Sequence, residues 1–305
     1  MKNEIVAVVT GGAVFIGSHL VDELFGREYT VRVIDNLVAG KKENVNPRAE
    51  FHEVDIRDRE ALRTVMEGAT HVFHFAALPR VQFSIENPFE TNDVNIGGTL
   101  NVLHAAKEVG VKRVVYSASS SAYGDQPTLP LHEGLLPLPQ SPYGIQKYTG
   151  EHYARVYTEI HGLPTVSLRY FNVYGPRMDL EGAYALVMGI FIKKKLEGKP
   201  LTITGDGEQT RDFTHVRDVV RANILAAEHL DVGHGEVLNI GAGQNISINK
   251  LAKMMGGEIE YVAARKESKH TLADNSKARS LMGWKPTVSI EDGVRELLEE
   301  WGFKG

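Results

Sequence analysis

The chain has 305 residues, enough for about two domains, and its 42% hydrophobic and 24% charged residues exclude a wholly disordered protein. It contains no cysteine, which excludes thiolate catalysis, cysteine-bound zinc and disulfide bonds. It has 34 Lys and Arg residues and 39 Asp and Glu residues, and the resulting net charge of −5 gives no broad basic surface for nucleic acid.

The first predicted element is a short apolar run at residues 5–9, too short for the apolar region of a signal peptide. No later run reaches the ~18 consecutive apolar residues that a membrane-spanning helix needs. We therefore expect a soluble, cytoplasmic protein with no membrane or nucleic-acid partner.

Short runs rich in valine and isoleucine alternate with segments of helical periodicity along the first part of the chain. Strands buried on both faces of a sheet lack polar alternation, so this order predicts an α/β fold with a Rossmann-type doubly wound parallel sheet. The predicted strands are 5–9, 31–34, 51–54, 72–77, 113–117 and 166–170. The predicted helices between them are 17–27, 58–66, 89–109 and 143–161.

From about residue 175 this alternation loosens, and we expect a smaller C-terminal α/β subdomain to begin there. Helices are predicted at 184–197 and 215–230. A final helix is predicted after Ser289, which forms a capping box with Asp292 ahead of apolar residues at helical spacing.

A glycine-rich turn, with Gly11 and Gly17 at its ends, links the first predicted strand to the first predicted helix. Such a turn brings backbone N–H groups and the positive end of the helix onto a pyrophosphate. Asp35 ends the second predicted strand, where a carboxylate accepts hydrogen bonds from an adenosine ribose. Together these features predict binding of NAD rather than NADP.

Val14 departs from this pattern, because the spacing Gly-x-x-Gly-x-x-Gly would place a glycine there. Its branched Cβ stands where the backbone should approach the phosphates. Two interpretations follow. Either the turn shifts slightly and still binds NAD, or NAD binding is weak.

Tyr143 and Lys147 are four residues apart in the predicted helix 143–161, so they share one helical face. A free tyrosine, with a pKa of ~10, is a poor base, but a neighbouring ammonium group and a cationic nicotinamide ring both favour the phenolate. The strand 113–117 leads into Ser119, Ser120 and Ser121 at the carboxyl edge of the sheet, where doubly wound folds bind ligands. We therefore predict that Tyr143 shuttles a proton.

Motifs of this kind cover nearly the whole chain, at residues 10–17, 35–36, 55–56, 74–77, 95–99, 119–124, 143–147, 169–177, 205–207, 211–213 and 273–274. On these motifs the sequence resembles the extended short-chain dehydrogenases/reductases, specifically the UDP-glucose 4-epimerase type. The resemblance implies that Tyr143 takes the proton of the C4 hydroxyl of a UDP-hexose while the C4 hydride passes to NAD. The 4-keto sugar then turns over, and the hydride returns to its opposite face.

The resemblance also assigns site residues by position. The catalytic residues are Tyr143, Lys147 and Ser119. The residues at NAD are Gly11, Phe15, Ile16, Gly17, Asp35, Asn36, Asp55, Ile56, Phe75, Ala76, Ala77, Asn95, Tyr143, Lys147 and Tyr170. The residues at the UDP-sugar are Ser119, Ser120, Tyr143, Asn172, Thr202, Arg211, Arg265 and Thr271. No metal site is expected.

The predicted NAD-binding domain takes residues 1–172 and about 212–244, and the predicted nucleotide-sugar subdomain takes about 173–211 and 245–305. In the family, dimers form by packing the helix that carries Tyr143 and the long helix before it into a four-helix bundle. We therefore expect a homodimer, which the apolar residues Val102, Leu103, Ala106, Tyr153, Val156 and Tyr157 would allow.

Three positions depart from the family or bear on specificity. Pro79, followed by Arg80, stands where such enzymes often carry a basic residue. In the family, a second arginine at the diphosphate usually lies ten residues before the aspartate that matches Asp274, whereas Arg265 lies nine residues before it. Lys266 is therefore the alternative to Arg265 for this contact. In the family, a large aromatic residue at the position of Thr271 excludes N-acetyl groups. Because threonine is small, we expect UDP-GlcNAc and UDP-GalNAc as substrates besides UDP-glucose and UDP-galactose.

Two other functions remain open. A nucleotide-sugar 4,6-dehydratase or decarboxylase usually needs an acid after the strand hydroxyl. Here Ser120, Ser121 and Ala122 follow Ser119, and no carboxylate occurs before Asp125. A non-catalytic dinucleotide-binding regulator is kept open by Val14, although the intact Tyr143 argues against it.

Overall fold

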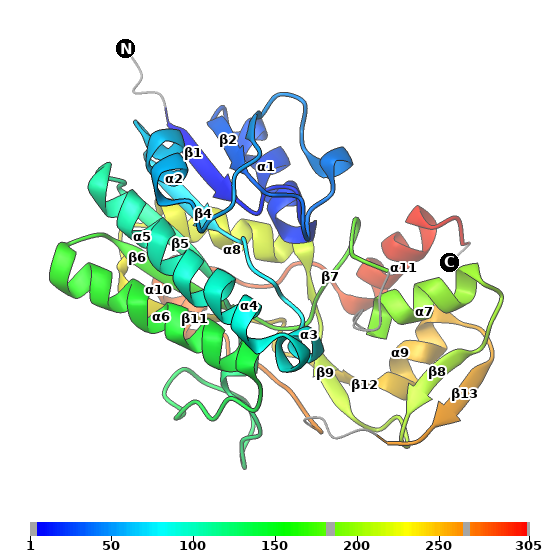
Figure 1. Ribbon diagram of the computed structural model, residues 1–305. Coiled ribbons are helices and arrows are strands. Elements are labelled where there is room, and N and C mark those ends of the chain that lie inside the picture. The colour runs from blue at the N-terminus through cyan, green and yellow to red at the C-terminus, as the bar shows by residue number, and fades with distance from the viewer. Residues whose placement is uncertain (1–4, 181–186, 265–268, 304–305) are drawn as a thin grey trace.

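The computed structural model describes residues 5–180, 187–264 and 269–303 (Figure 1). Its centre is a seven-stranded parallel sheet in the order β11-β6-β5-β4-β1-β2-β3. The chain starts at β1 and winds outward in both directions, which confirms the predicted doubly wound fold. The strands are β1 (Val6–Thr10), β2 (Thr30–Ile34), β3 (Glu50–His52), β4 (His71–His74), β5 (Arg113–Ser119), β6 (Thr165–Tyr170) and β11 (His234–Ile240).

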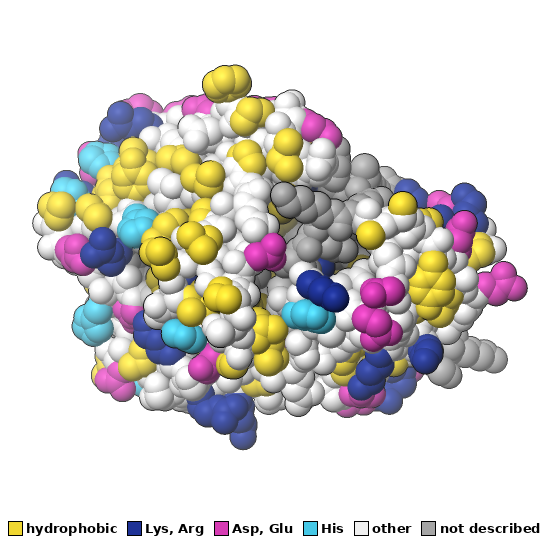
Figure 2. All heavy atoms as spheres, turned by 90° about the horizontal axis from the view of Figure 1, so that it is seen from below, with side chains coloured by type: hydrophobic (Ala, Val, Ile, Leu, Met, Phe, Trp, Pro, Cys, Tyr) yellow, Lys and Arg dark blue, Asp and Glu magenta, His cyan; other side chains and the backbone are white. Residues whose placement is uncertain are grey.

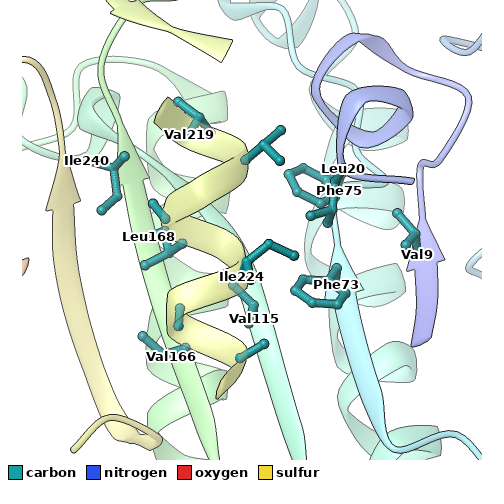
Figure 3. Close-up of a cluster of buried hydrophobic side chains, with 14 of the residues drawn as sticks. Val9, Leu20, Phe73, Phe75, Val115, Val166, Leu168, Val219, Ile224 and Ile240 are labelled. Atoms are coloured by element: carbon teal, nitrogen blue, oxygen red, sulfur yellow. The ribbon is translucent and has the colours of Figure 1, made fainter. Parts of the chain in front are cut away.

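Helices cover both faces of this sheet (Figure 1). One face carries α1 (Phe15–Gly26) and α8 (Val216–Glu228), and the other carries α2 (Arg59–Met66), α5 (Thr99–Glu108) and α6 (Pro142–His161). Side chains that follow one another along a strand point to opposite faces. Val9 accordingly packs with Leu20 and Ile224 on the first face (Figure 3), whereas Val8 packs with Leu62 on the second.

Several predicted helices begin at the residues that the sequence indicates. Asp58 caps α2 by accepting a hydrogen bond from the Ala61 amide at 3.0 Å. Ser289 caps α11 (Ile290–Glu300) by accepting from the Asp292 amide at 3.1 Å, which confirms the predicted capping box. These hydroxyl and carboxylate oxygens satisfy backbone N–H groups that have no acceptor within the helix.

The predicted helix 89–109 is more complex than its periodicity indicates. It consists of α4 (Pro88–Asn92), a π-helical turn (Asp93–Gly98) and α5, and it is preceded by a short helix, α3 (Val81–Glu86), which was not predicted. The strand β11 was also missed, because Glu236 and Asn239 interrupt its apolar residues. Asn239 is buried there and donates hydrogen bonds to the carbonyl oxygens of Leu131 and Asp274.

A smaller lobe with its own buried cluster lies beside the carboxyl ends of the sheet strands (Figure 1). Within the described residues none of the helices is long and apolar enough to cross a membrane. The predicted helix 184–197 corresponds to α7, and its first three positions lie outside the described residues. The elements beyond the sheet are β7 (Val173–Tyr174), α7 (Val187–Leu196), β8 (Leu201–Thr204), β9 (Thr210–Asp212), β10 (Thr214–His215), β12 (Asn245–Ser247), α9 (Ile248–Met255), β13 (Ile259–Val262), α10 (Ser276–Met282) and α11.

Asp212 ties together segments that run between the two parts of the molecule. Its carboxylate accepts hydrogen bonds from the amides of Ala242 at 2.8 Å, Gly243 at 3.0 Å and Ala273 at 2.9 Å. Burial raises the pKa of Asp212 to about 6, and these three hydrogen bonds oppose the rise. One side chain therefore holds the end of β9, the turn after β11 and the segment before α10.

The apolar residues assigned to a dimer surface belong mostly to the core of the chain itself. Val102, Leu103 and Ala106 are at most 1% exposed and pack in the same cluster as Tyr157. The prediction that these buried residues offer a face to a second copy is therefore wrong, whereas Tyr153 and Val156 are half-buried and the homodimer itself stays a prediction. An amphipathic helix has the same periodicity whether its apolar stripe covers a sheet or another subunit.

Candidate active site

A cleft of about 720 Å³ lies at the carboxyl edge of the sheet, lined from both lobes, and a smaller cavity adjoins it. Figure 2 shows the surface hollowed between the two lobes, with acidic and basic side chains near the hollow. Val14, Ala39 and Ala77 line both spaces. Together the two spaces form one elongated site.

The turn between β1 and α1 needs glycine at both of its ends. Gly11 has φ of +73°, and a Cβ on it would lie 2.6 Å from the backbone nitrogen of Ala76. A Cβ on Gly17 would lie 2.1 Å from the carbonyl oxygen of Gly11, so Gly17 allows α1 to pack under the turn and does not line either cavity. Gly11 lines the smaller cavity, as predicted for a residue at the cofactor.

Val14 is the N-cap of α1, with φ of −84° and ψ of 170°. Any L-residue adopts this conformation, so the backbone does not require glycine there. The departure from the glycine pattern is therefore the side chain alone, which stands where the two cavities meet. The amides that begin α1 have no acceptor within the helix, and Phe15 and Ile16 line the cleft beside this positive helix end.

Asp35 directly follows β2 and lines the smaller cavity with 5% of its surface exposed. Its carboxylate accepts hydrogen bonds from the amides of Ala13 at 3.0 Å and Leu37 at 2.9 Å, and burial raises its pKa. A carboxylate has about four acceptor positions, so two remain for the hydroxyls of a ribose. The other predicted cofactor residues that line this cavity are Asn36, Ile56, Ala76 and Ala77.

The structure does not bring Asp55 or Asn95 into the lining of either cavity. Asp55 accepts a hydrogen bond from Asn36 at 2.9 Å and pairs with Arg57 at 2.7 Å, and these bonds lower its pKa to about 2. Asn95 is buried, and its side chain bonds the backbone of Leu78. Both residues support the residues that line the cavity.

The start of α6 places the predicted proton shuttle in the cleft. Ser141 caps the helix by accepting a hydrogen bond from Gly144, so Tyr143 lies in its first turn. The backbone N–H of Tyr143 donates to Ser84 Oγ at 3.0 Å. Lys147 follows one turn later, and both side chains line the cleft beside Phe75 and Tyr170.

The pKa of Tyr143 moves opposite to the prediction. Burial raises it to about 12, and a hydrogen bond with Ser119 acts in the other direction. The Nζ of Lys147 donates to the Ser117 carbonyl oxygen at 2.7 Å. Burial also lowers the pKa of Lys147 to about 8, which the Glu151 carboxylate opposes.

Ser119 is oriented by its neighbour Ser121. Ser119 Oγ accepts hydrogen bonds from the backbone N–H of Ser121 at 3.2 Å and from its hydroxyl at 2.8 Å. A hydroxyl oxygen has two lone pairs, so the Ser119 proton is left to donate into the cleft. Ser120 also lines the cleft.

On the side of the smaller lobe, three of the residues predicted at the sugar nucleotide line the cleft, namely Asn172, Arg211 and Thr271. Thr271 Oγ1 accepts a hydrogen bond from the Asp212 amide at 3.3 Å. The Thr271 hydroxyl therefore also has a role in holding β9.

Of the other two predicted substrate residues, the one that the structure describes is not brought to this cleft. Thr202 lies on β8, outside the lining, and its buried Oγ1 finds no hydrogen-bond partner in the part of the chain that is described. Arg265 and its rival Lys266 lie outside the described residues.

Two charged pairs at the site were not predicted from the sequence. Arg80, just before α3, pairs with Asp179, which follows β7, and both line the cleft. Glu151 pairs with Arg169 behind Lys147. Glu151 stands one helical turn after Lys147, which is a signal that could have indicated it. No local signal connects Arg80 to Asp179.

The comparisons with known proteins agree over almost the whole chain. Residues 7–241 match the NAD dependent epimerase/dehydratase family. A UDP-glucose 4-epimerase from Thermotoga maritima, solved with UDP-glucose, is 40% identical with a TM-score of 0.93, covering 97% of this chain and 98% of its own. A UDP-N-acetylglucosamine 4-epimerase from Methanobrevibacter ruminantium, in complex with UDP-N-acetylmuramic acid, is 38% identical with a TM-score of 0.92, covering 98% of both chains. The UDP-glucose 4-epimerase of Mycolicibacterium smegmatis is 35% identical over 96% of this chain and 97% of its own.

Proposed function

The chain belongs to the NAD dependent epimerase/dehydratase family, and we propose that it inverts C4 of UDP-glucose and UDP-galactose. It is an isomerase of the UDP-glucose 4-epimerase type with NAD as cofactor. The proposed substrates also include the N-acetylated forms of the two sugars. The observation that carries this proposal is the convergence of Tyr143, Lys147 and Ser119 in one cleft beside a dinucleotide-type turn.

The residues of the cofactor side fit a dinucleotide. The N-terminus of α1 offers amide donors to a pyrophosphate. The Asp35 carboxylate, held by two backbone amides at 2.9 and 3.0 Å, offers its remaining acceptor positions to a ribose. NAD held by these residues would supply the acceptor for the C4 hydride and the donor for its return. Phe75 and Tyr170, whose rings stack at 6.4 Å, border the part of the cleft next to Lys147.

Tyr143 acts as the base that removes the proton of the C4 hydroxyl and later returns it. A phenol with a pKa of about 12 is almost wholly protonated at neutral pH and cannot accept a proton, so added positive charge near its oxygen must lower that pKa for the phenolate to form. Lys147 lies on the same helical face and supplies one such charge. Ser119 donates its proton to the reacting oxygen and holds it near Tyr143.

The smaller lobe binds the nucleotide. Arg211 and Asn172 provide the donors for a diphosphate, because both line the cleft and both carry N–H groups. We assign residues 1–172 and about 212–244 to NAD, and about 173–211 and 245–305 to the sugar nucleotide. A sugar held mainly through its nucleotide can turn over between the two hydride transfers.

The other functions considered need a group that the described residues of this cleft do not offer outside an ion pair. A dehydratase or a decarboxylase uses an additional acid or base at the sugar. Among the described residues that line the cleft, the one carboxylate is Asp179, and Arg80 holds it in an ion pair. The intact Tyr143, Lys147 and Ser119 favour catalysis over a purely regulatory role.

The purified protein should convert UDP-galactose to UDP-glucose, measured by anion-exchange chromatography or NMR. Tyr143→Phe should lower kcat by ~10²–10⁴-fold, the scale for loss of a general base, while NAD content and thermal unfolding stay close to wild type. Tyr148→Phe, on the same helix but outside the cleft lining, is the matched control. Wild-type activity in Tyr143→Phe would refute the assignment.

A further inference from the structure

An ion pair spans the cleft between the two sides of the site. The guanidinium of Arg80 donates from Nη2 to Asp179 Oδ2, and the two side chains are 36% and 40% exposed. Arg80 belongs to the loop between β4 and α3, and Asp179 to the segment that follows β7. Both residues line the cleft, so the pair stands in the space that a substrate enters.

Hydrogen bonds of α3 connect the residue Arg80 to the start of α6, and we therefore assign this pair to the sugar end of the site rather than to the nucleotide end. The amide of Ser84 donates to the Arg80 carbonyl oxygen at 2.9 Å, and Ser84 Oγ accepts from the amide of Tyr143 at 3.0 Å. Two hydrogen bonds therefore connect Arg80 to the proton shuttle. Arg211, proposed for the diphosphate, lies on β9 in the smaller lobe.

The charges along the described cleft lining are few. They are Arg80, Lys147, Asp179 and Arg211. Lys147 is directed at the Ser117 carbonyl oxygen, which leaves Arg80 and Asp179 as the charged groups beside the sugar end. Because Arg80 and Asp179 carry opposite charges in contact, each cancels the charge that the other would offer to a substrate.

A hexose and its uronate differ at C6, where the uronate carries a carboxylate in place of a hydroxymethyl group. An enzyme that accepts the uronate must offer a cation, and arginine matches a carboxylate with two parallel hydrogen bonds. A carboxylate that enters a partly enclosed site without such a partner loses hydration and gains no compensation. Relatives of this chain include an enzyme named for UDP-glucuronate, so the distinction matters for this fold.

On the basis of the function proposed above, we propose that the Arg80–Asp179 ion pair selects neutral UDP-hexoses against UDP-uronates. Asp179 occupies the guanidinium that a sugar carboxylate would require, and its own negative charge repels that carboxylate. Neutral hydroxyl groups meet neither obstacle, since they can donate to the Asp179 carboxylate. Asp179 is thus a specificity-determining residue that acts through Arg80.

The test compares kcat/KM for UDP-glucuronate and UDP-glucose in the wild-type holoenzyme and in three variants of it. Asp179→Asn, which leaves Arg80 its charge, should raise the uronate-to-hexose ratio by about tenfold or more. Arg80→Gln, which leaves the carboxylate unopposed, should lower that ratio below the wild-type value. The double variant Asp179→Asn/Arg80→Gln should lose the gain of the first.

The matched control is Asp22→Asn. Asp22 pairs with Arg177 at 2.7 Å, with both side chains 36% exposed, and neither residue lines the cleft. Breaking this pair should leave the ratio unchanged. Binding of UDP-glucuronate to each protein by calorimetry gives the same comparison without turnover, for variants that have lost catalysis.

An unchanged ratio in Asp179→Asn, a gain that persists in the double variant, or equal use of both substrates by wild type would each overturn the proposal. A wild-type enzyme that epimerises UDP-glucose yet shows these results refutes only the role of the ion pair. Absence of C4 inversion with every UDP-hexose would instead refute the proposed function.

Discussion

The carboxylate of Glu151 and the guanidinium of Arg169 form a two-point ion pair in which each side chain is 3% exposed. Arg169 Nε donates to Oε1 at 2.8 Å, and its Nη2 donates to Oε2 at 2.7 Å. The guanidinium also lies 4.5 Å from the ring centre of Tyr123. The pair joins α6 to β6 next to Lys147, so it positions the helix that carries Tyr143 and Lys147.

Glu151→Gln should destabilise the protein by about 3–5 kcal/mol, because it leaves the Arg169 charge buried without a counter-ion. The double variant Glu151→Met/Arg169→Met should cost less, since it removes both charges together. Urea unfolding monitored by circular dichroism measures both changes. An exposed pair, broken by Glu159→Gln opposite Arg155, is the control and should cost about 1 kcal/mol or less. Equal losses in the buried and the exposed pair would contradict this account.

Activity and stability should respond to alkaline pH in opposite directions through Lys147. Its folded-state pKa of about 8 lies below the ~10.4 of an unfolded lysine, so the unfolded chain binds more protons between these values. The contribution of Lys147 to stability therefore rises with pH across this window, whereas kcat/KM falls above pH about 8 as the charge is lost. Unfolding free energies of wild type and Lys147→Met at pH 7 and 9.5 isolate the stability term. A pH-independent difference between them would contradict the prediction.

Val14→Gly should raise the affinity for NAD. The backbone at residue 14 already has a conformation open to every residue, so the substitution removes only the side chain at the junction of the two cavities. Val14→Ala should give an intermediate affinity if the steric account is correct. Calorimetric titration of the cofactor-free protein measures each value. Equal or weaker binding by the glycine variant would mean that the turn accommodates valine.

Thr271→Tyr should abolish turnover of UDP-GalNAc and spare UDP-galactose. The small Thr271 side chain leaves room in the cleft for an acetamide, and a tyrosine ring would fill that room. Wild type should discriminate only modestly between the two sugars, because a missing small group is worth ~1–3 kcal/mol. The measurement is kcat/KM for both substrates, with Thr271→Ser as the control that keeps the hydroxyl bonded to Asp212. If wild type turns over neither N-acetylated substrate, another residue closes the pocket.

The fold and the helix that carries Tyr143 and Lys147 could be predicted from the sequence, because both depend on local residue patterns. Valine and isoleucine runs predict buried parallel strands, and the spacing of Tyr143 and Lys147 places them on one face of α6. The Asp35 position is equally local, since a carboxylate at the end of the second strand reaches the turn after the first. These features depend on neighbours within one or two elements.

Other features depend on contacts between distant segments, which no local pattern encodes. Arg80 and Asp179 meet although 99 positions separate them. The direction of the Tyr143 pKa follows from how deeply the ring is buried, which residue spacing does not reveal. For the same reason Val102 and Leu103 were predicted to lie on a dimer surface. The periodicity of an apolar stripe does not indicate whether the stripe packs on the sheet or on a second subunit.

The bonds of Asp212 bear on how this architecture can change over generations. The Asp212 carboxylate accepts hydrogen bonds from amides in the turn after β11 and in the segment before α10. The smaller lobe therefore cannot be exchanged for that of a relative by replacing one continuous stretch of the chain. A hybrid gene would have to transfer at least three separated segments at once to keep Ala242, Gly243 and Ala273 in register with β9. New substrate preferences in this lineage should therefore arise by single replacements in the cleft, at positions such as 179 and 271, rather than by shuffling of lobes.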